Sequence, residues 1–129
     1  MHRKNLTIFL VDDNPIDIEI YRQHLLNSGY DKISVYHDGG ECITAISNNP
    51  DIIFLDHHLV SYNGIDVLKK IKSYNHNIYV VMLSGDESIE ISKNAFRYGA
   101  FDYILKGKDD LGKIDATIHK IIRNKQLLY

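Results

Sequence analysis

Short apolar runs alternate with longer amphipathic segments along this chain. Five runs have the length of strands and are rich in Ile, Val, Leu, Phe and Tyr: 7–11, 33–36, 51–55, 78–83 and 101–105. Three of them are almost continuously apolar, which is typical of strands covered on both faces. The pattern therefore predicts a buried sheet rather than one that is open to water on one side.

The segments between these runs carry the spacing of helices. Ile18, Tyr21 and Leu25 recur three and four residues apart, as on one face of a helix. Asn14 can cap this helix, and Pro15 suits its first position. The last segment repeats the spacing at Leu111, Ile114, Ile118 and Ile121. The chain is thus predicted to alternate five strands with five helices.

Strict alternation of strands and helices with short links determines the expected fold class. Such links favour right-handed crossovers and a mostly parallel sheet with helices on both faces. We predict an α/β fold, a doubly wound five-stranded parallel sheet in one domain over residues 1–129, because no repeat or internal linker interrupts the pattern. With the strand order 2-1-3-4-5, the first, third, fourth and fifth strands would be neighbours.

Composition and charge exclude several classes of protein. The 129 residues are 44% hydrophobic and 25% charged, with a net charge of −2, which does not suggest binding to nucleic acid or to an anionic membrane. No run approaches the roughly 18 apolar residues of a membrane span. The single cysteine, Cys42, cannot form an internal disulfide and reads as a small core residue. We expect a cytoplasmic protein.

Polar residues follow four of the five predicted strands. Asp12 and Asp13 end the first, Asp56 ends the third, Ser84 follows the fourth, and Lys106 follows the fifth. The carboxyl ends of parallel strands share one edge of the sheet, where open α/β folds bind their ligands. These side chains are therefore expected to meet in one shallow cleft.

Such a cleft would crowd negative charge. Two carboxylates about 4 Å apart repel by roughly 4 kcal/mol at an effective dielectric of 20, and Lys106 offsets only part of this for three acids. A divalent cation would resolve the repulsion, and oxygen-only ligands favour Mg²⁺. A metal, a lysine and a hydroxyl around Asp56 suit phosphoryl chemistry with this carboxylate as nucleophile. Taken one at a time, however, these residues would be interpreted as parts of turns, as a helix cap or as a solvent-exposed lysine.

Four segments resemble the receiver domains of two-component response regulators, the group that includes the stand-alone chemotaxis regulator. They are FLVDDNP (9–15), IIFLDHHLVSYNGIDVL (52–68), VVMLSG (80–85) and AFRYGAFDYILKG (95–107). The resemblance extends over essentially the whole chain. It implies a flavodoxin-like fold with the strand order 2-1-3-4-5, and a signalling switch rather than an enzyme with a separate substrate.

The resemblance also implies roles for matching positions. Asp56 would accept a phosphoryl group from a phosphohistidine and later lose it by slow hydrolysis. Asp13 and Asp56 would ligate Mg²⁺ directly, Asp12 would act mainly through water, and the backbone carbonyl of His58 would be a further ligand. The donor would be a sensor histidine kinase or a histidine phosphotransfer protein.

Three more positions match the switch of the family. Ser84 would hydrogen-bond the phosphoryl oxygen, Lys106 would pair with it, and the ring of Tyr103 would turn inwards. The face formed by the 101–105 strand and the helices on either side of it would then bind a downstream effector differently. A weak homodimer is also possible for such a face.

The chain departs from the usual receiver pattern at four places. Val60 and Gly107 stand where proline is common, and Ser84 stands where threonine is also common. The pair His57-His58 is unusual beside the acceptor and invites a metal site. Adjacent side chains diverge, however, and no His or Cys lies at a spacing that completes a zinc set. We expect His57 to face inwards or to pack locally, and His58 to line the rim of the cleft with Asp86.

Two other functions compete with the switch. A pseudo-receiver would bind partners without phosphorylation, although an adapter has no need to keep these charges crowded. A true Mg²⁺-dependent phosphatase of the haloacid dehalogenase type would need a second Asp where His58 stands. The sequence leaves open the cognate kinase, the target, and whether the domain acts alone or within a longer regulator.

Overall fold

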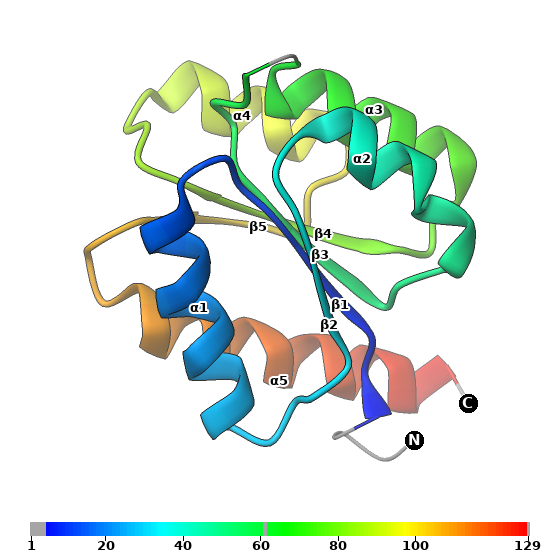
Figure 1. The fold of residues 1–129 in the computed structure, drawn as a ribbon. Helices are drawn as coiled ribbons and strands as arrows, with labels where there is room; N and C mark the ends of the chain where they lie inside the picture. Colours follow the sequence, from blue (N-terminus) through cyan, green and yellow to red (C-terminus); the bar gives the residue numbers. More distant parts are fainter. Residues whose placement is uncertain (1–4, 61, 129) are drawn as a thin grey trace.

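The fold is described by a computed structural model that covers residues 5–60 and 62–128. Parallel strands alternate with helices along the chain (Figure 1). The elements are β1 (Ile8–Val11), α1 (Pro15–Asn27), β2 (Ile33–Tyr36), α2 (Gly39–Thr44), the short 3₁₀ helix η2 (Ile46–Asn48), β3 (Ile52–Leu55), α3 (Gly64–Tyr74), β4 (Tyr79–Ser84), α4 (Ile89–Arg97), β5 (Asp102–Leu105) and α5 (Asp110–Leu128).

The strands form one sheet in the order β2-β1-β3-β4-β5, and all neighbouring pairs are parallel. Helices α1 and α5 cover one face of the sheet, and α2, α3 and α4 cover the other (Figure 1). The predicted α/β class, strand order and two-sided covering are confirmed. The order reverses between β1 and β3, so the carboxyl ends of these two strands flank the crevice in which such folds bind ligands.

Two apolar clusters hold the layers together. Leu10 and Phe54 belong to the cluster under α1 and α5, whereas Val11 and Leu55 belong to the cluster under α2, α3 and α4. Because side chains alternate along a strand, the central strands supply both clusters, and every residue of β1 and β3 is buried. This explains the continuous apolar runs in the sequence, and Cys42 is buried in the second cluster as expected.

Side-chain caps define where the helices begin at the carboxyl edge of the sheet. The Asn14 side chain accepts hydrogen bonds from the backbone N–H groups of Ile16 and Asp17, and Pro15 follows it as predicted. Asn63 and Ser88 cap α3 and α4 in the same way. The loops after β1, β3 and β4 therefore run into helices with fixed starting points.

Within the described residues, no helix has the length and apolar character that crossing a bilayer requires.

Candidate functional site

Three carboxylates meet where β1 and β3 end. Asp12 and Asp13 follow β1, Asp56 follows β3, and one oxygen of each lies within 4.8 Å of the others. The backbone register explains this approach, since Val11 pairs with Leu55 and the Asp56 N–H donates to the carbonyl of Val11 at 3.0 Å. The sequence prediction that these acids share one edge of the sheet is thus confirmed by the geometry.

Lys106 reaches into this group from the end of β5. Its Nζ lies 2.7 Å from Asp12 Oδ2, 2.9 Å from Asp17 Oδ2 and 3.3 Å from Asp56 Oδ2. Asp17, in the first turn of α1, was not predicted from the sequence as part of the site. The four carboxylates and one ammonium carry a net charge of −3 when all are ionised, since four negative charges meet one positive charge.

The electrostatics of this group show competing effects. Burial raises the pKa of Asp12, against the hydrogen bonds from Lys106 and from the Asn14 N–H, which lower it. Burial lowers the pKa of Lys106, but hydrogen bonds to Asp12 and Asp17 outweigh it, so the net shift is upwards and the ammonium is retained. The donor set consists of oxygens, and its uncompensated negative charge fits Mg²⁺.

Ser84 and Tyr103 flank the other side of the site. Ser84 is the last residue of β4, is completely buried, and its Oγ accepts from the Asp86 N–H at 3.2 Å. The Tyr103 hydroxyl donates to the backbone carbonyl of Asp86 at 2.7 Å. Burial raises the pKa of Tyr103, and the nearby Ser84 hydroxyl opposes this shift. The tyrosine ring is thus tied to the loop that leaves β4.

The loop after Asp56 closes tightly on the start of α3. The Gly64 N–H donates to the carbonyl of His57 at 2.7 Å. A Cβ at position 64 would lie only 2.5 Å from the Asp56 carbonyl oxygen and 2.7 Å from the His57 Cα. Only glycine allows this approach, so Gly64 fixes the backbone that carries Asp56. Val60 lies in the same loop and is 80% exposed.

Gly107 has a backbone conformation that proline cannot adopt. Its φ is +82°, and its N–H donates to Asp110 Oδ2 at 3.0 Å. The same carboxylate oxygen accepts from the Tyr21 hydroxyl at 2.6 Å. The Asp110 carboxylate therefore ties the backbone after Lys106 to α5 and α1. With glycine in place of the usual proline, this backbone is held by a hydrogen bond that proline could not donate.

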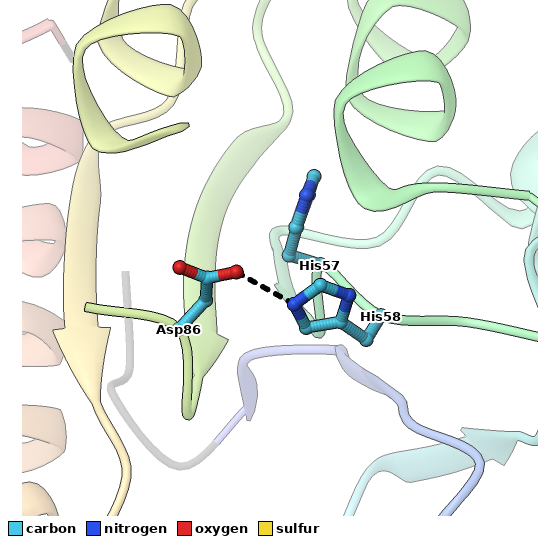
Figure 2. Close-up of side chains that lie close together, drawn as sticks. All are labelled: His57, His58 and Asp86. Carbon is cyan, nitrogen blue, oxygen red and sulfur yellow. Dashed lines mark hydrogen bonds and ion pairs between the residues drawn. The ribbon is translucent and has the colours of Figure 1, made fainter. Parts of the chain in front are cut away.

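The histidine pair lies beside the acidic group. Figure 2 shows His57 and His58 leaving the end of β3, with Asp86 facing the His58 ring from the loop after β4. His58 Nε2 lies 2.7 Å from Asp86 Oδ2, and the centroids of the two histidine rings are 4.7 Å apart. His58 is exposed at the rim beside Asp86, as predicted. No His or Cys was expected at a spacing that would complete a zinc set with this pair, and the third possible ligand that folding brings beside it is a carboxylate, that of Asp86.

A family model for the response regulator receiver domain matches residues 8–119. The chain belongs to this family. Receiver domains are signalling domains of two-component systems rather than classical enzymes. They interact with kinases or phosphotransfer proteins and with effectors, and they generally bind Mg²⁺ in an acidic pocket.

Curated relatives of this receiver domain are longer proteins. It is 29% identical over 108 residues to the probable C4-dicarboxylate response regulator DctR of Priestia megaterium, covering 82% of this chain and 47% of the relative. It is 33% identical over 101 residues to a cyclic di-GMP phosphodiesterase of Thermotoga maritima, covering 78% of this chain and 27% of the relative. The chain therefore spans less than half the length of these relatives.

Solved structures of receiver domains superimpose closely on this one. A CheY-like receiver domain protein from Methanospirillum hungatei has a TM-score of 0.82 at 26% identity, with 93% of this chain and 99% of that chain covered. The Borrelia burgdorferi structure of a CheX-CheY-BeF3-Mg²⁺ complex has a TM-score of 0.84 at 25% identity, with 91% and 89% covered. Both agree with the fold predicted from the sequence.

Sequence reasoning missed three features of this receiver domain. Asp17 was overlooked because only strand ends were searched, although its place in the first turn of the helix after Asp13 puts it at the same edge. The contact between Tyr21 and Asp110 joins residues 89 positions apart, and no local signal indicates it. Gly64 follows a capping asparagine, but its approach to Asp56 depends on the folded loop.

Proposed function

We propose that this receiver domain is a cytoplasmic, phosphorylation-dependent signalling switch in which Asp56 accepts the phosphoryl group. The central observation is that Asp56 lies among Asp12, Asp13 and Lys106, with the buried Ser84 hydroxyl at the end of the neighbouring strand β4. Side chains from the ends of three strands, β1, β4 and β5, thus surround the carboxylate at the end of β3, and this arrangement suits phosphoryl transfer.

The proposed reaction is transfer from a phosphohistidine. A carboxylate oxygen of Asp56 attacks the phosphorus, a P–O bond forms as the P–N bond breaks, and the imidazole leaves with the bonding electron pair and takes up a proton. Lys106, already 3.3 Å from Asp56, would pair with an oxygen of the transferred group. Ser84 would donate its hydroxyl to another oxygen after giving up its contact with the Asp86 N–H.

Asp13 and Asp56 would hold Mg²⁺ directly, with Asp12 acting through water and the His58 carbonyl as a further ligand. When bound, the ion would neutralise charge on the transferred phosphoryl group. The oxygen donors within 4.8 Å of one another and the net charge of these groups support this assignment. Lys106 meanwhile holds Asp12 in place, because its ammonium lies 2.7 Å from Asp12 Oδ2.

The proposed switch links Ser84 to Tyr103 through the loop after β4. A phosphoryl group that draws the Ser84 hydroxyl towards it would break the bond to the Asp86 N–H, and the Tyr103 hydroxyl is bonded to the carbonyl of the same residue. The loop and the ring would therefore move together. We infer that the face formed by α4, β5 and α5 changes its affinity for an effector, and that this face also offers a weak homodimer contact.

The similarity to the Borrelia CheY, which was crystallised with CheX, BeF3 and Mg²⁺, supports both the ion and the binding of a protein partner. By analogy, the donor here would be a sensor histidine kinase or a histidine phosphotransfer protein. The single receiver domain over residues 1–129 would act alone or as the input part of a longer regulator.

The direct test is intact mass spectrometry after incubation with Mg²⁺ and a small phosphodonor. Wild type should gain the mass of one phosphoryl group, and Asp56→Asn should gain none. Asp31→Asn, an exposed aspartate outside the site, serves as the matched control and should react like wild type.

Other outcomes of this measurement would reject the switch. A wild-type protein that gains no mass with either a small donor or a histidine phosphotransfer protein would be a pseudo-receiver that binds partners without phosphorylation. An Asp56→Asn variant that is modified as fast as wild type would place the acceptor at another residue.

A further inference from the structure

A second group of metal-ligating side chains lies beside the acidic group, and it contains two imidazoles. His57, His58 and Asp86 each offer one ligand atom, and these atoms all lie within 4.8 Å of one another. Figure 2 shows that they come from two loops, the histidines from the end of β3 and the carboxylate from the end of β4. We propose that these three residues form a binding site for a divalent transition metal ion, with Zn²⁺ as its type.

The donor set determines which metal fits. Imidazole nitrogen suits zinc, copper and nickel, whereas Mg²⁺ takes oxygen ligands. Two nitrogens and one carboxylate oxygen make three ligands of a tetrahedral zinc site and leave the fourth position for water. The site therefore differs in chemistry from the oxygen-only group of Asp12, Asp13 and Asp56.

The geometry needs only side-chain movement. His58 Nε2 and Asp86 Oδ2 lie 2.7 Å apart, at hydrogen-bond distance, whereas two ligands of a tetrahedral zinc ion lie about 3.4 Å apart. The His58 side chain is 66% exposed, so its ring can rotate to open this distance. All three ligand atoms already lie within 4.8 Å of one another, so movements of the side chains alone can bring them around one ion.

The His57 ring supplies an independent observation. Its Nδ1 is buried and has no hydrogen-bond partner among the described residues. Buried ring nitrogens normally find a partner, so a buried one without a partner calls for an explanation. The proposed site takes Nδ1 as the ligand atom of His57, so an ion held by His58 and Asp86 would also give this nitrogen a partner.

Asp86 is already held in position by bonds to groups outside the ligand set. Its Oδ1 accepts from the Ser88 N–H at 2.8 Å, which leaves Oδ2 facing His58. Its backbone carbonyl accepts from the Tyr103 hydroxyl at 2.7 Å. Outer partners of this kind orient the ligands of metal sites and strengthen binding. A bound ion would thus join the loop after β3 to the loop after β4.

Zinc binding to the whole chain tests the proposal. Competition with a chromogenic zinc chelator is measured with Mg²⁺ in large excess, so that the oxygen-only group is occupied by its preferred ion. Wild type should bind one Zn²⁺, and both His58→Ala and Asp86→Asn should weaken binding at least about 100-fold, since loss of an outer partner alone costs about 10- to 100-fold. The His58 variant removes an exposed side chain and leaves the core intact.

The controls separate this site from other zinc ligands. His76→Ala removes an exposed histidine on the far loop after α3, and Asp13→Asn alters the acidic group, so both should bind like wild type. Co²⁺ in place of Zn²⁺ should give the visible absorption of a tetrahedral site, and this absorption should be absent in His58→Ala. A wild type that takes no zinc from the chelator, or a His58→Ala or Asp86→Asn variant that binds like wild type, would overturn the proposal. Weakening by Asp13→Asn instead would assign the zinc to the acidic group.

Discussion

Lys106 is the residue on which the charge balance of the site depends. Its ammonium contacts carboxylates at the ends of β1 and β3 and in the first turn of α1. Its side chain is 17% exposed and that of Asp12 is 8% exposed, so water screens these pairs only in part. Without the ammonium, the carboxylates would repel one another with no internal compensation.

We therefore expect Lys106→Met to lower the free energy of unfolding by about 2 kcal/mol at pH 7 without metal. Removing one partner of a fully buried ion pair costs roughly 3–5 kcal/mol, and the loss here is smaller because the cleft opens to water. Millimolar Mg²⁺ should restore part of the loss, and the variant should bind Mg²⁺ more tightly because no ammonium competes. Urea denaturation with and without MgCl₂ measures both effects. Lys93→Met, at an exposed lysine, is the control, and equal losses in the two variants would contradict this account.

Asp110 predicts a pH dependence of stability. Burial raises the pKa of its carboxyl. Hydrogen bonds from the Gly107 N–H, the Tyr21 hydroxyl and the Leu111 N–H lower the pKa by more, so it lies below its ordinary value of 3.8. The folded protein then binds fewer protons than the unfolded chain near that pH. The stabilisation is complete above the ordinary pKa and is lost as the pH falls through the folded pKa.

The comparison that tests this is wild type against Asp110→Asn in urea denaturation at several pH values. The variant should be less stable by a constant amount above about pH 5, and the difference should shrink below about pH 4. A difference that stays the same down to the lowest pH would show that the carboxylate charge is not the source of the stabilisation.

At the scale of elements, the start of α3 determines where Asp56 sits. Gly64 allows the first turn of α3 to pack against the backbone of Asp56 and His57, and neither backbone can move away without displacing β3. The three glycines at 64, 85 and 107 differ in what they need. At Gly64 a Cβ would overlap with backbone atoms, and at Gly107 the backbone has a positive φ. At Gly85 neither restriction applies, since a Cβ there would meet nothing within 4 Å.

Alanine at these three positions should therefore destabilise in a fixed order. Gly64→Ala should cost about 3 kcal/mol through overlap with backbone, and Gly107→Ala about 1 kcal/mol through its backbone conformation. Gly85→Ala should change the stability by less than about 0.5 kcal/mol. Thermal denaturation gives the order, and the rate of mass gain with a phosphodonor should fall most for Gly64→Ala. A Gly64→Ala variant as stable as Gly85→Ala would contradict the packing argument.

At the scale of the whole molecule, the two apolar clusters share one sheet. Tyr21 and Tyr30 lie in the cluster under α1 and α5, and Tyr36 and Tyr103 border the cluster under α2, α3 and α4. Because β1 and β3 contribute side chains to both clusters, neither layer can lose its packing while the other keeps its own.

The chain should accordingly unfold in one cooperative transition. Far-UV circular dichroism follows the helices and the sheet, whereas tyrosine near-UV signals follow the packing of both clusters, and the two transitions should coincide in urea. The prediction of a single domain over residues 1–129 depends on this result. Two separated transitions would indicate that one helical layer unfolds independently.

The alternation of apolar runs and helical spacing was enough to predict the parallel sheet, its two-sided covering and four strand ends that carry functional groups. These features follow from the local spacing of apolar residues and from the rule that the carboxyl ends of parallel strands lie at one edge of the sheet. Because each ends a strand or lies one or two residues after it, the sequence was enough to name Asp12, Asp13, Asp56, Ser84 and Lys106. Boundaries shifted by one residue, as when Ser84 proved to be the last residue of β4.

Only the tertiary structure decided which distant side chains touch. Asp17 joins Lys106 across 89 positions, Asp86 joins His58 across 28, and Tyr21 anchors Asp110 across another 89. Position along the chain can place Asp17, His58 and Asp86 near one edge of the sheet, but which side chains pair depends on how a helix or loop turns after its strand ends. The sequence by itself determined that an acidic cleft exists at one edge of the sheet. Packing determined the partners of each charge, since distances across that edge are set by the fold and not by spacing along the chain.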